Sequence, residues 1–519
     1  MQIYEKSALF ASFLLTLNMM KKILTILSVL ALSAVFSMKT EARDYRADAF
    51  GAKADGNTLN TTILQAAIDY ISANGGGRLV LSGGDFVSGT IYLKDNVTLH
   101  IEKGARLLGS LNPWDYVRDP DAKWTSLIFA VKQKNIGITG EGEINCRGFL
   151  VATKGVDYCH LGLIEDPLKL DRLQEGKRPE NLHFYKCENI TVTGITLRDP
   201  ASWNQQYDKC RNILVDGVKV DAKSYWNNDG IDIVDCSDVI IRNCDFDAAD
   251  DVYCFKSHSK DGLSENILVE NCRGRSSANG IKFGTYTLGK FKHFRFYNME
   301  IVDTYRSAIT IATVDGAQIE DVVIDGLKSL HTGNPIFIRT GSRRRQEQTP
   351  YMKDIVIRNV YAEVPFDKPD AGYMYEGPVE DLPRNVCASG IQGIPGIPIQ
   401  NLTLENIEIV YPGKADANYA YRGCSKADLE SIPELEKSYP EFSNWKELPA
   451  WGFYIRHAEG IVLNNVKLTV ADVDYRPAIV ADDVNGLTLK GVQIIQADAP
   501  KGKKQIVTNN VRKFTNKKK

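Results

Sequence analysis

Short stretches in which apolar and polar side chains alternate recur along most of the chain. Two adjoining copies read NITVTGITL from Asn189 and NILVDGVKV from Asn212. Each copy holds two runs of alternating β-branched residues separated by a turn residue, which is typical of two short strands. Further copies begin at Asp238, Asn266 and His293, so the copies follow one another at intervals of 23 to 28 residues. A period in the twenties indicates a solenoid in which each coil stacks on the next.

This pattern predicts an all-β fold, a right-handed parallel β-helix, as a single domain over residues 43–500. Strands of successive coils would pair in parallel about 4.8 Å apart, with Ile, Val, Leu and Cys side chains stacked inside. A leucine-rich repeat horseshoe is the alternative solenoid, but its leucine spacing and its helices are not found in this sequence. One clear amphipathic helix, Asn60–Ser72, precedes the repeats. We expect it to cap the N-terminal end of the solenoid.

The period stretches at several inserted segments, and we expect these loops to form the walls of a groove on the solenoid. The main insertions are near residues 110–130, 150–180, 340–350, 361–385 and 412–450. After the last repeat, residues 501–519 contain eight basic and no acidic side chains. This composition predicts a basic flexible tail.

The N-terminal residues have the pattern of a signal peptide. Lys21 and Lys22 precede an apolar run from Ile23 to Phe36, which is too short to span a membrane. We therefore expect residues 1–42 to be removed, with residues 1–18 an extension if translation starts at Met19 or Met20. The protein would then be exported to the periplasm or outside the cell, with no membrane span after cleavage. An uncleaved membrane anchor is the alternative.

The ten cysteines invite a disulfide interpretation in an exported protein. However, Cys187, Cys210 and Cys236 occupy one position of the repeat, while Cys244 and Cys272 share another. Side chains at equivalent positions of a solenoid stack as a ladder in the core. We expect these five to be free buried thiols, with bridges as the alternative.

The overall charge is nearly balanced, with 63 Lys and Arg against 65 Asp and Glu and a net charge of −2. A nucleic-acid partner therefore has no electrostatic support. Hydrophobic residues make up 43% of the chain, which excludes a disordered protein. We expect a monomer.

Two neighbouring copies carry an unusual cluster of acidic side chains. The first reads WNNDGID from Trp226 and contains Asp229, and the second reads AADDVYCFKS from Ala248 and contains Asp250 and Asp251. Because these positions are about one coil apart, the three carboxylates should share one surface. Crowded like charges raise the pKa of at least one of them, as a general acid requires while its neighbour stays ionised. Such a set of carboxylates is the minimum for glycoside hydrolysis, although Asp also crowds turns for structural reasons.

Residues 46–495 resemble glycoside hydrolase family 28, the polygalacturonase family. The motifs that carry the resemblance are Phe50-Gly51-Ala52 with Asp55-Gly56, Arg178–Leu182, Pro200–Trp203, Asn227-Asn228-Asp229 and Asp250-Asp251. The resemblance implies an inverting hydrolase with no metal and no cofactor. It also implies that Asp250 protonates the leaving oxygen, while Asp229 and Asp251 hold and activate water.

The chain is atypical for this family in two motifs. Asn279 stands where the family's Gly-His-Gly motif has its histidine. Thr310 and Ala312 stand where its Arg-Ile-Lys motif has the two cations that grip a galacturonate carboxylate. Other cations near the acidic cluster could bind an acidic sugar, and one aromatic side chain could stack on a sugar face. The predicted substrate-binding residues are Asn227, Trp226, Asn279, Lys282, Lys256 and Arg306.

Together these features predict a secreted glycoside hydrolase that cleaves a pectin-type or other acidic polysaccharide or its oligosaccharides. The large insertions favour a groove closed at one end and therefore exo action. A polysaccharide lyase or epimerase on the same fold is one alternative, since Lys256 and Lys282 could serve its chemistry. A non-catalytic glycan-binding solenoid is the other, because both departed motifs could reflect loss of activity.

Overall fold

The computed structural model describes most of the chain. The described residues are 43–166, 172–343, 349–367, 387–415, 422–499 and 502–517. The predicted signal peptide, residues 1–42, lies outside them. In the part of the chain that the structure describes, no helix has both the length and the apolar character needed to cross a membrane.

The described chain is built mostly from strands that all belong to one parallel sheet system. The strands of the N-terminal coils are β1 Asp44–Arg46, β2 Asp55–Leu59, β3 Gly77–Leu81, β4 Asp85–Ser88, β5 Ile91–Tyr92, β6 Val97–Ile101, β7 Arg106–Gly109, β8 Ser126–Val131, β9 Lys134–Thr139 and β10 Glu143–Asn145. Those of the middle coils are β11 Glu180–Tyr185, β12 Glu188–Thr193, β13 Thr196–Arg198, β14 Gln205–Asp208, β15 Arg211–Asp216, β16 Lys219–Ala222, β17 Ile231–Val234, β18 Ser237–Arg242, β19 Asp245–Ala248, β20 Tyr253–Ser257, β21 Leu263–Glu270, β22 Arg273–Ser276 and β23 Ile281–Thr287. The later strands are β24 Lys290–Val302, β25 Ser307–Ala312, β26 Gln318–Leu330, β27 Asn334–Arg339, β28 Tyr351–Glu363, β29 Ser389–Gln392, β30 Ile399–Tyr411, β31 Phe453–Val470, β32 Ile479–Lys490, β33 Gln493–Gln496 and β34 Ile506–Lys517.

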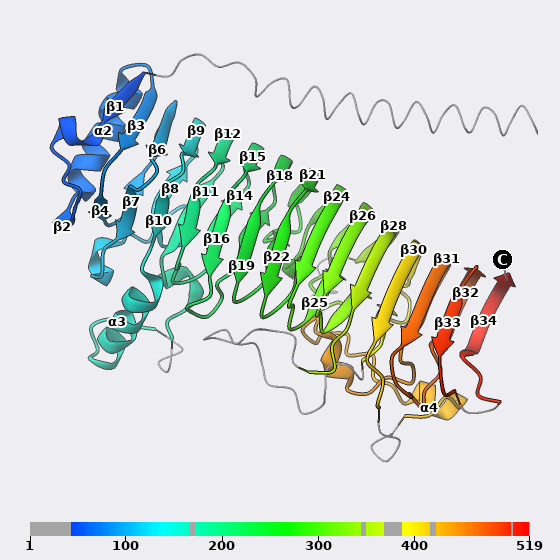
Figure 1. Cartoon of the computed structure of the whole chain (residues 1–519). Coiled ribbons are helices and arrows are strands. Elements are labelled where there is room, and N and C mark those ends of the chain that lie inside the picture. The colour runs from blue at the N-terminus through cyan, green and yellow to red at the C-terminus, as the bar shows by residue number, and fades with distance from the viewer. Residues whose placement is uncertain are drawn as a thin grey trace, which may run out of the picture.

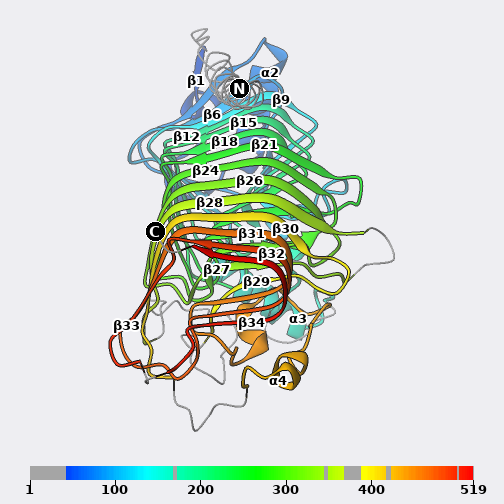
Figure 2. The same cartoon turned by 90° about the vertical axis from the view of Figure 1, so that its right-hand side faces the viewer.

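Each coil contributes strands to three parallel ladders, and the coils stack into one elongated spiral (Figures 1 and 2). The first ladder runs through β8, β11, β14, β17, β20, β23, β25, β27 and β29, and the second through β9, β12, β15, β18 and β21. The third contains β10, β13, β16, β19 and β22. In later coils one long strand serves two ladders, as β24 pairs with both β21 and β22. The predicted right-handed parallel β-helix is confirmed.

The polar residue that opens each repeat lies near the start of a second-ladder strand and bends the chain there. Asn189 and Asn212 have φ angles of 59° and 54°, a left-handed conformation that Asn adopts at low cost. Their amides also stack, since Asn212 Nδ2 donates to Asn189 Oδ1 at 2.9 Å. The repeated Asn or Asp is therefore explained by backbone geometry and by a side-chain ladder.

The cysteines behave as core residues. Cys187, Cys210 and Cys236 are buried, and all ten cysteines are free. The Cys210 backbone N–H donates to Cys236 Sγ at 3.3 Å, and the Cys187 N–H donates to Cys210 Sγ at the same distance. The prediction of free, stacked thiols is confirmed.

Helices lie at the N-terminal end and along one side of the coils. Helix α2, Thr61–Ala73, buries Leu64, Ala67, Ile68 and Ile71 and covers the first coils, as predicted. The sequence analysis missed α3, Gly148–His160, inside the insertion near residues 150–180. Its apolar stripe is weak, because only Gly148, Val151, Ala152 and Gly155 are buried. Helix α4, Lys426–Glu430, and α3 project from the same side of the solenoid (Figures 1 and 2).

The C-terminal prediction was wrong for residues 506–517. These form β34, which pairs in parallel with β32 over most of its length. Val511 packs against the core beside Val484 of β32, although most of β34 is exposed or half-buried. Alternating side chains such as Ile506 and Phe514 extend the last coil despite the high positive charge, which by itself favours a flexible tail.

Candidate active site

The three predicted aspartates lie in the turns that lead into the first ladder. Because Ile231 of β17 pairs with Tyr253 of β20, Asp229 and Asp251, each two residues earlier, occupy equivalent positions of adjacent coils. Asp250 lies one residue before Asp251, so it is displaced by one position from the equivalent pair Asp229 and Asp251. The one-coil spacing inferred from the sequence therefore relates Asp229 most closely to Asp251, and it brings Asp250 to the same edge.

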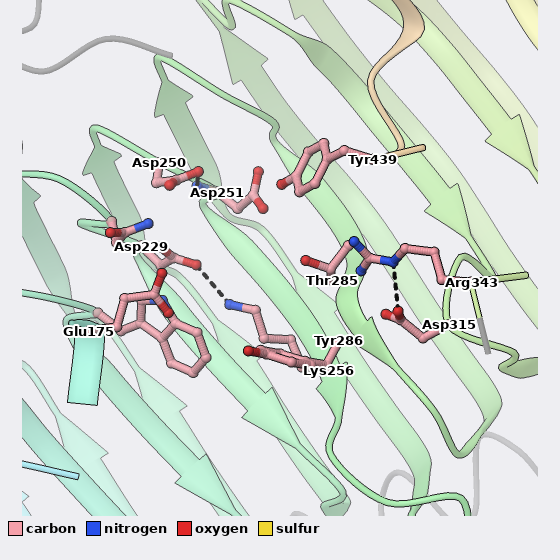
Figure 3. Close-up of a pocket in the computed structure, with 12 residues that line it drawn as sticks. Glu175, Asp229, Asp250, Asp251, Lys256, Thr285, Tyr286, Asp315, Arg343 and Tyr439 are labelled. Atoms are coloured by element: carbon pink, nitrogen blue, oxygen red, sulfur yellow. Dashed lines mark hydrogen bonds and ion pairs between the residues drawn. The ribbon is translucent and has the colours of Figure 1, made fainter. Parts of the chain in front are cut away.

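All three carboxylates line one cavity of about 460 Å³. Figure 3 shows Asp229, Asp250 and Asp251 directed into the same space. The other lining residues are Glu175, Trp203, Asn227, Lys256, Thr285, Tyr286, Asp315, Arg343 and Tyr439. Of the predicted substrate-binding residues, Asn227 and Lys256 are on this wall.

Lys256 of β20 holds the first carboxylate. Its Nζ donates to Asp229 Oδ2 at 2.9 Å and also bonds to Asp232, and it lies 3.6 Å from the centre of the Trp203 ring. All three side chains of this ion-paired group are buried. Although burial alone lowers the pKa of an ammonium, the two carboxylates raise the pKa of Lys256 well above its ordinary value. Lys256 is therefore a fixed cation at neutral pH.

A second network orients Asp251. Asn279 donates to Asp251 Oδ1 from its side-chain Nδ2 at 2.6 Å and from its backbone N–H at 3.2 Å. Thr310 in turn donates its hydroxyl to Asn279 Oδ1 at 2.9 Å, which fixes the direction of the amide. Lys282 lies behind the same carboxylate, with Nζ 3.7 Å from Asp251 Oδ2. Asn279 and Lys282 thus contact a carboxylate rather than line the cavity.

Burial shifts the acid–base behaviour of the cluster. It raises the pKa of Asp229 well above the ordinary value, with further contributions from the neighbouring Asp232. Burial and the charge of Asp251 also raise the pKa of Asp250. Asp250 is more exposed than Asp229 and Asp251, and its Oδ1 accepts from the Asp251 N–H at 3.0 Å. Adjacent carboxyls with raised pKa values, one of them paired with an ammonium, form an arrangement that acid–base catalysis uses.

The segment around η6, Phe442–Trp445, closes one side of the cavity. It packs on the first ladder through a small core that contains Phe337, Phe442 and Trp445. Tyr439 from this segment faces the cavity beside Asp251 (Figure 3), with Lys282 Nζ 5.0 Å from its ring centre. The insertion near residues 412–450 was predicted to form a wall, and Tyr439 from its described residues lines the cavity.

Two predicted substrate-binding residues are placed elsewhere. Arg306 is buried and forms an ion pair with Glu441, close to the Tyr439 ring. Trp226 does not line the cavity, and the Arg172 guanidinium lies 4.8 Å from its ring centre. The cavity wall instead presents Trp203 and Tyr286 as aromatic surfaces.

Asn227 is held by Arg178, which is buried. The Arg178 guanidinium donates to Asn227 Oδ1 at 2.7 Å and to the Trp226 and Ala201 carbonyls at 2.7 and 2.6 Å. With a φ of 58°, Asn227 adopts a left-handed conformation that suits Asn. The turn that carries Asp229 is therefore fixed by a charged side chain from two coils earlier.

Asp229, Asp251 and Cys254 could each offer an atom to a metal ion, and these atoms lie within 4.8 Å of one another. The cluster already has a cation, because the Lys256 ammonium bonds to Asp229. The Cys254 thiol donates to Asp251 Oδ2 at 3.9 Å. These contacts do not favour a metal site.

Comparison with known proteins places the chain in a family. Residues 78–364 match the profile of glycosyl hydrolases family 28. The chain belongs to this family. It is 26% identical over 407 residues to a probable polygalacturonase of Vitis vinifera, covering 70% of this chain and 74% of that protein. It is also 26% identical over 288 residues to an exo-poly-alpha-D-galacturonosidase of Dickeya chrysanthemi, covering 46% of this chain and 47% of that protein.

Solved structures show the same fold. A family 28 exopolygalacturonase of Yersinia enterocolitica aligns with a TM-score of 0.56 at 19% identity, covering 92% of this chain and 79% of that chain. A hyperthermoactive exopolygalacturonase from Thermotoga maritima aligns with a TM-score of 0.53 at 20% identity, covering 71% of this chain and 87% of that chain. The chain is thus a polygalacturonase-like glycoside hydrolase with a parallel β-helix.

Proposed function

We propose that this glycoside hydrolase is exported and cleaves a pectin-type, acidic polysaccharide or its oligosaccharides by a single displacement that inverts the anomeric carbon. Asp250 donates a proton to the leaving oxygen, and Asp229 with Asp251 holds and deprotonates the attacking water. The supporting observation is that all three carboxylates line one cavity, where one is ion-paired and another has a raised pKa. The base must be ionised, and the Lys256 ammonium favours the ionised form of Asp229, although burial raises the pKa of both Asp229 and Asp250.

Exo action is supported by the wall that closes the cavity. Tyr439 stands at the cavity beside Asp251, and the segment that carries it is anchored by Arg306 and Glu441. A groove closed in this way accepts a chain end more readily than the middle of a polymer. The names of two relatives, an exo-poly-alpha-D-galacturonosidase and an exopolygalacturonase, agree with this proposal.

A lyase or epimerase is disfavoured by the charge state of the lysines. A base that abstracts a proton must be neutral, yet carboxylate neighbours raise the pKa of both Lys256 and Lys282, although burial alone lowers each. Lys256 is also fully engaged with Asp229 and Asp232. Both lysines act as counter-ions in this site.

Product analysis tests the proposal. We expect wild-type protein to release saturated mono- or oligosaccharides from a panel of pectic polysaccharides, with the anomeric configuration inverted in a time-resolved NMR spectrum. The viscosity of a polymer substrate should fall slowly relative to the release of reducing ends. Products with a new double bond, seen by ultraviolet absorbance, would instead identify a lyase, and retained configuration would exclude the single displacement.

Asn279 gives a sharper test of how the water-binding carboxylate is oriented. Asn279→Ala removes the Nδ2 donor at 2.6 Å from Asp251 and leaves the backbone donor in place. A charge-assisted hydrogen bond contributes about 1.5–3 kcal/mol, so kcat should fall at least about tenfold with little change in KM. The control is Asn279→His, which keeps a donor and should retain more activity than the Ala variant. Equal kcat in wild type and Asn279→Ala would remove Asn279 from the mechanism.

A further inference from the structure

A second cavity of about 500 Å³ adjoins the catalytic one on the side of the N-terminal coils. The two share Glu175, Asn227 and Tyr286 on their walls, so they lie next to each other. The second cavity is lined by Arg118, Lys123, Trp124, Arg172, Leu173, Gln174, Glu175, Gly176, Arg178, Asn227 and Tyr286. We refer to it as the basic pocket, after Arg118, Lys123 and Arg172.

The two cavities differ strongly in charge. The catalytic cavity presents Glu175, Asp315 and the three aspartates against Lys256 and Arg343. The basic pocket presents four cationic side chains against Glu175 alone. An anionic group of the substrate is therefore favoured in the basic pocket and disfavoured beside the aspartates.

Three cations that line the basic pocket form no ion pair within the described part of the chain. Among the described residues, no carboxylate lies within ion-pair distance of Arg118, Lys123 or Arg172. Arg118 uses one N–H on the Lys123 carbonyl at 2.9 Å, and Arg172 lies over the Trp226 ring. The remaining guanidinium donors and the Lys123 ammonium are available to a ligand.

On the other side of the aspartates the cations are already paired. Lys282 faces Asp251, Arg306 pairs with Glu441, and Arg343 Nε lies 2.8 Å from Asp315. A carboxylate entering there would have to compete with a protein carboxylate for each of these three cations.

The basic pocket is held in a defined shape. Arg118 and Thr125 form an antiparallel bridge, and the Thr125 hydroxyl donates to the Gly176 carbonyl at 3.0 Å. Arg178 then links this wall to Asn227 at the catalytic cavity. Trp124 packs against Trp203 with ring centres 4.6 Å apart, so the two cavities also share an aromatic wall.

We propose that the basic pocket binds the carboxylate of a uronic acid in the sugar residue next to the scissile bond. The inference rests on the proposed function, because it assigns a place to the acidic sugar of that substrate. Charge recognition then comes from Arg118, Lys123 and Arg172 on the N-terminal side of the aspartates. The sugar on the Tyr439 side needs no negative charge, so the chain suits a substrate in which the acidic residue occupies only one side of the cleaved bond.

Binding to a catalytically inactive variant tests this assignment without relying on turnover. The probes are trigalacturonate and its fully methyl-esterified form, titrated by calorimetry into Asp250→Asn. We expect the acid to bind roughly tenfold more tightly than the ester at low salt, and added salt should narrow the difference. Adding Lys123→Gln and Arg172→Gln to Asp250→Asn should strongly reduce the preference, chiefly by lowering the affinity for the acid.

The matched control is Lys103→Gln, an exposed lysine outside both cavities, which should leave the preference intact. If the triple variant prefers the acid as strongly as Asp250→Asn does, or if Asp250→Asn never prefers it, the proposal is overturned. The result is separable from the proposed function. Wild type that hydrolyses pectic glycans while the Gln changes alter nothing would refute the basic pocket alone. Acid-selective binding without turnover would refute the hydrolytic role alone.

Discussion

Asp250→Asn should lower kcat at least about a hundredfold while the protein keeps its fold and melting temperature, because Asp250 is the proton donor of the proposed mechanism. An amide cannot give a proton to the leaving oxygen. It can still accept the hydrogen bond from the Asp251 N–H, which now ends at Asp250 Oδ1 at 3.0 Å, so the turn should be preserved. The measurement is steady-state kinetics on the best substrate of the pectic panel, with circular dichroism and thermal unfolding beside it.

Asp245→Asn is the matched control for that variant. Asp245 lies on the same coil, on β19, but it is exposed and pairs with Arg273 on the third ladder. Its loss should change kcat and stability little, since exposed ion pairs contribute about 0–1 kcal/mol. If Asp250→Asn retains near wild-type kcat, another group must be the acid, and the role assigned to Asp250 fails.

The repeated coil explains why so much of the fold was visible in the sequence. Each repeat has the same local pattern, a left-handed Asn or Asp such as Asn189 followed by alternating side chains. One recognised repeat therefore predicts the structure of the repeats beside it. The same regularity brings Asp229 and Asp251 together at coil spacing. Residues that depart from the repeat could not be placed in this way. Tyr439 reaches the cavity from an insertion whose path depends on packing against Phe337 and not on any period.

The partners of a buried charge were equally hard to infer. The sequence predicts Lys256 as a substrate-binding cation. Its contact with Asp232 could not be predicted, because the sequence does not show that both side chains point toward the same space. Asp232 lies on β17 and Lys256 on β20, two positions apart in register, and only the three-dimensional arrangement shows that they meet. Arg306 is a similar case, since its carboxylate partner, Glu441, lies in an insertion and follows no repeat.

Lys256→Met should strongly lower the free energy of unfolding. Removing the ammonium leaves Asp229 and Asp232 buried without a counter-ion, and breaking a buried ion pair from one side costs about 3–5 kcal/mol. One of the two carboxyls will take up a proton to reduce this cost. Lys223→Met is the matched control, because Lys223 also lies between two aspartates, Asp221 and Asp247, but is partly exposed and should lose less than about 1 kcal/mol.

The loss in Lys256→Met should depend on pH in a direction that identifies its cause. Burial already raises the pKa of Asp232 to about 6 and raises the pKa of Asp229, and removal of Lys256 should raise both again. When a carboxyl has a higher pKa folded than unfolded, folding takes up protons, so stability falls as the pH rises above the unfolded value near 3.8. The variant should therefore be most destabilised at neutral pH and recover towards pH 4 in chemical denaturation experiments.

The double variant Lys256→Met/Asp232→Asn should regain part of the stability lost at neutral pH, because only one buried charge remains. Any residual activity of Lys256→Met should require a higher pH than wild type, since Asp229 must lose its proton to act as a base. A deficit that is the same at pH 4 and pH 7 would show that Lys256 contributes by packing against Trp203 rather than by its charge.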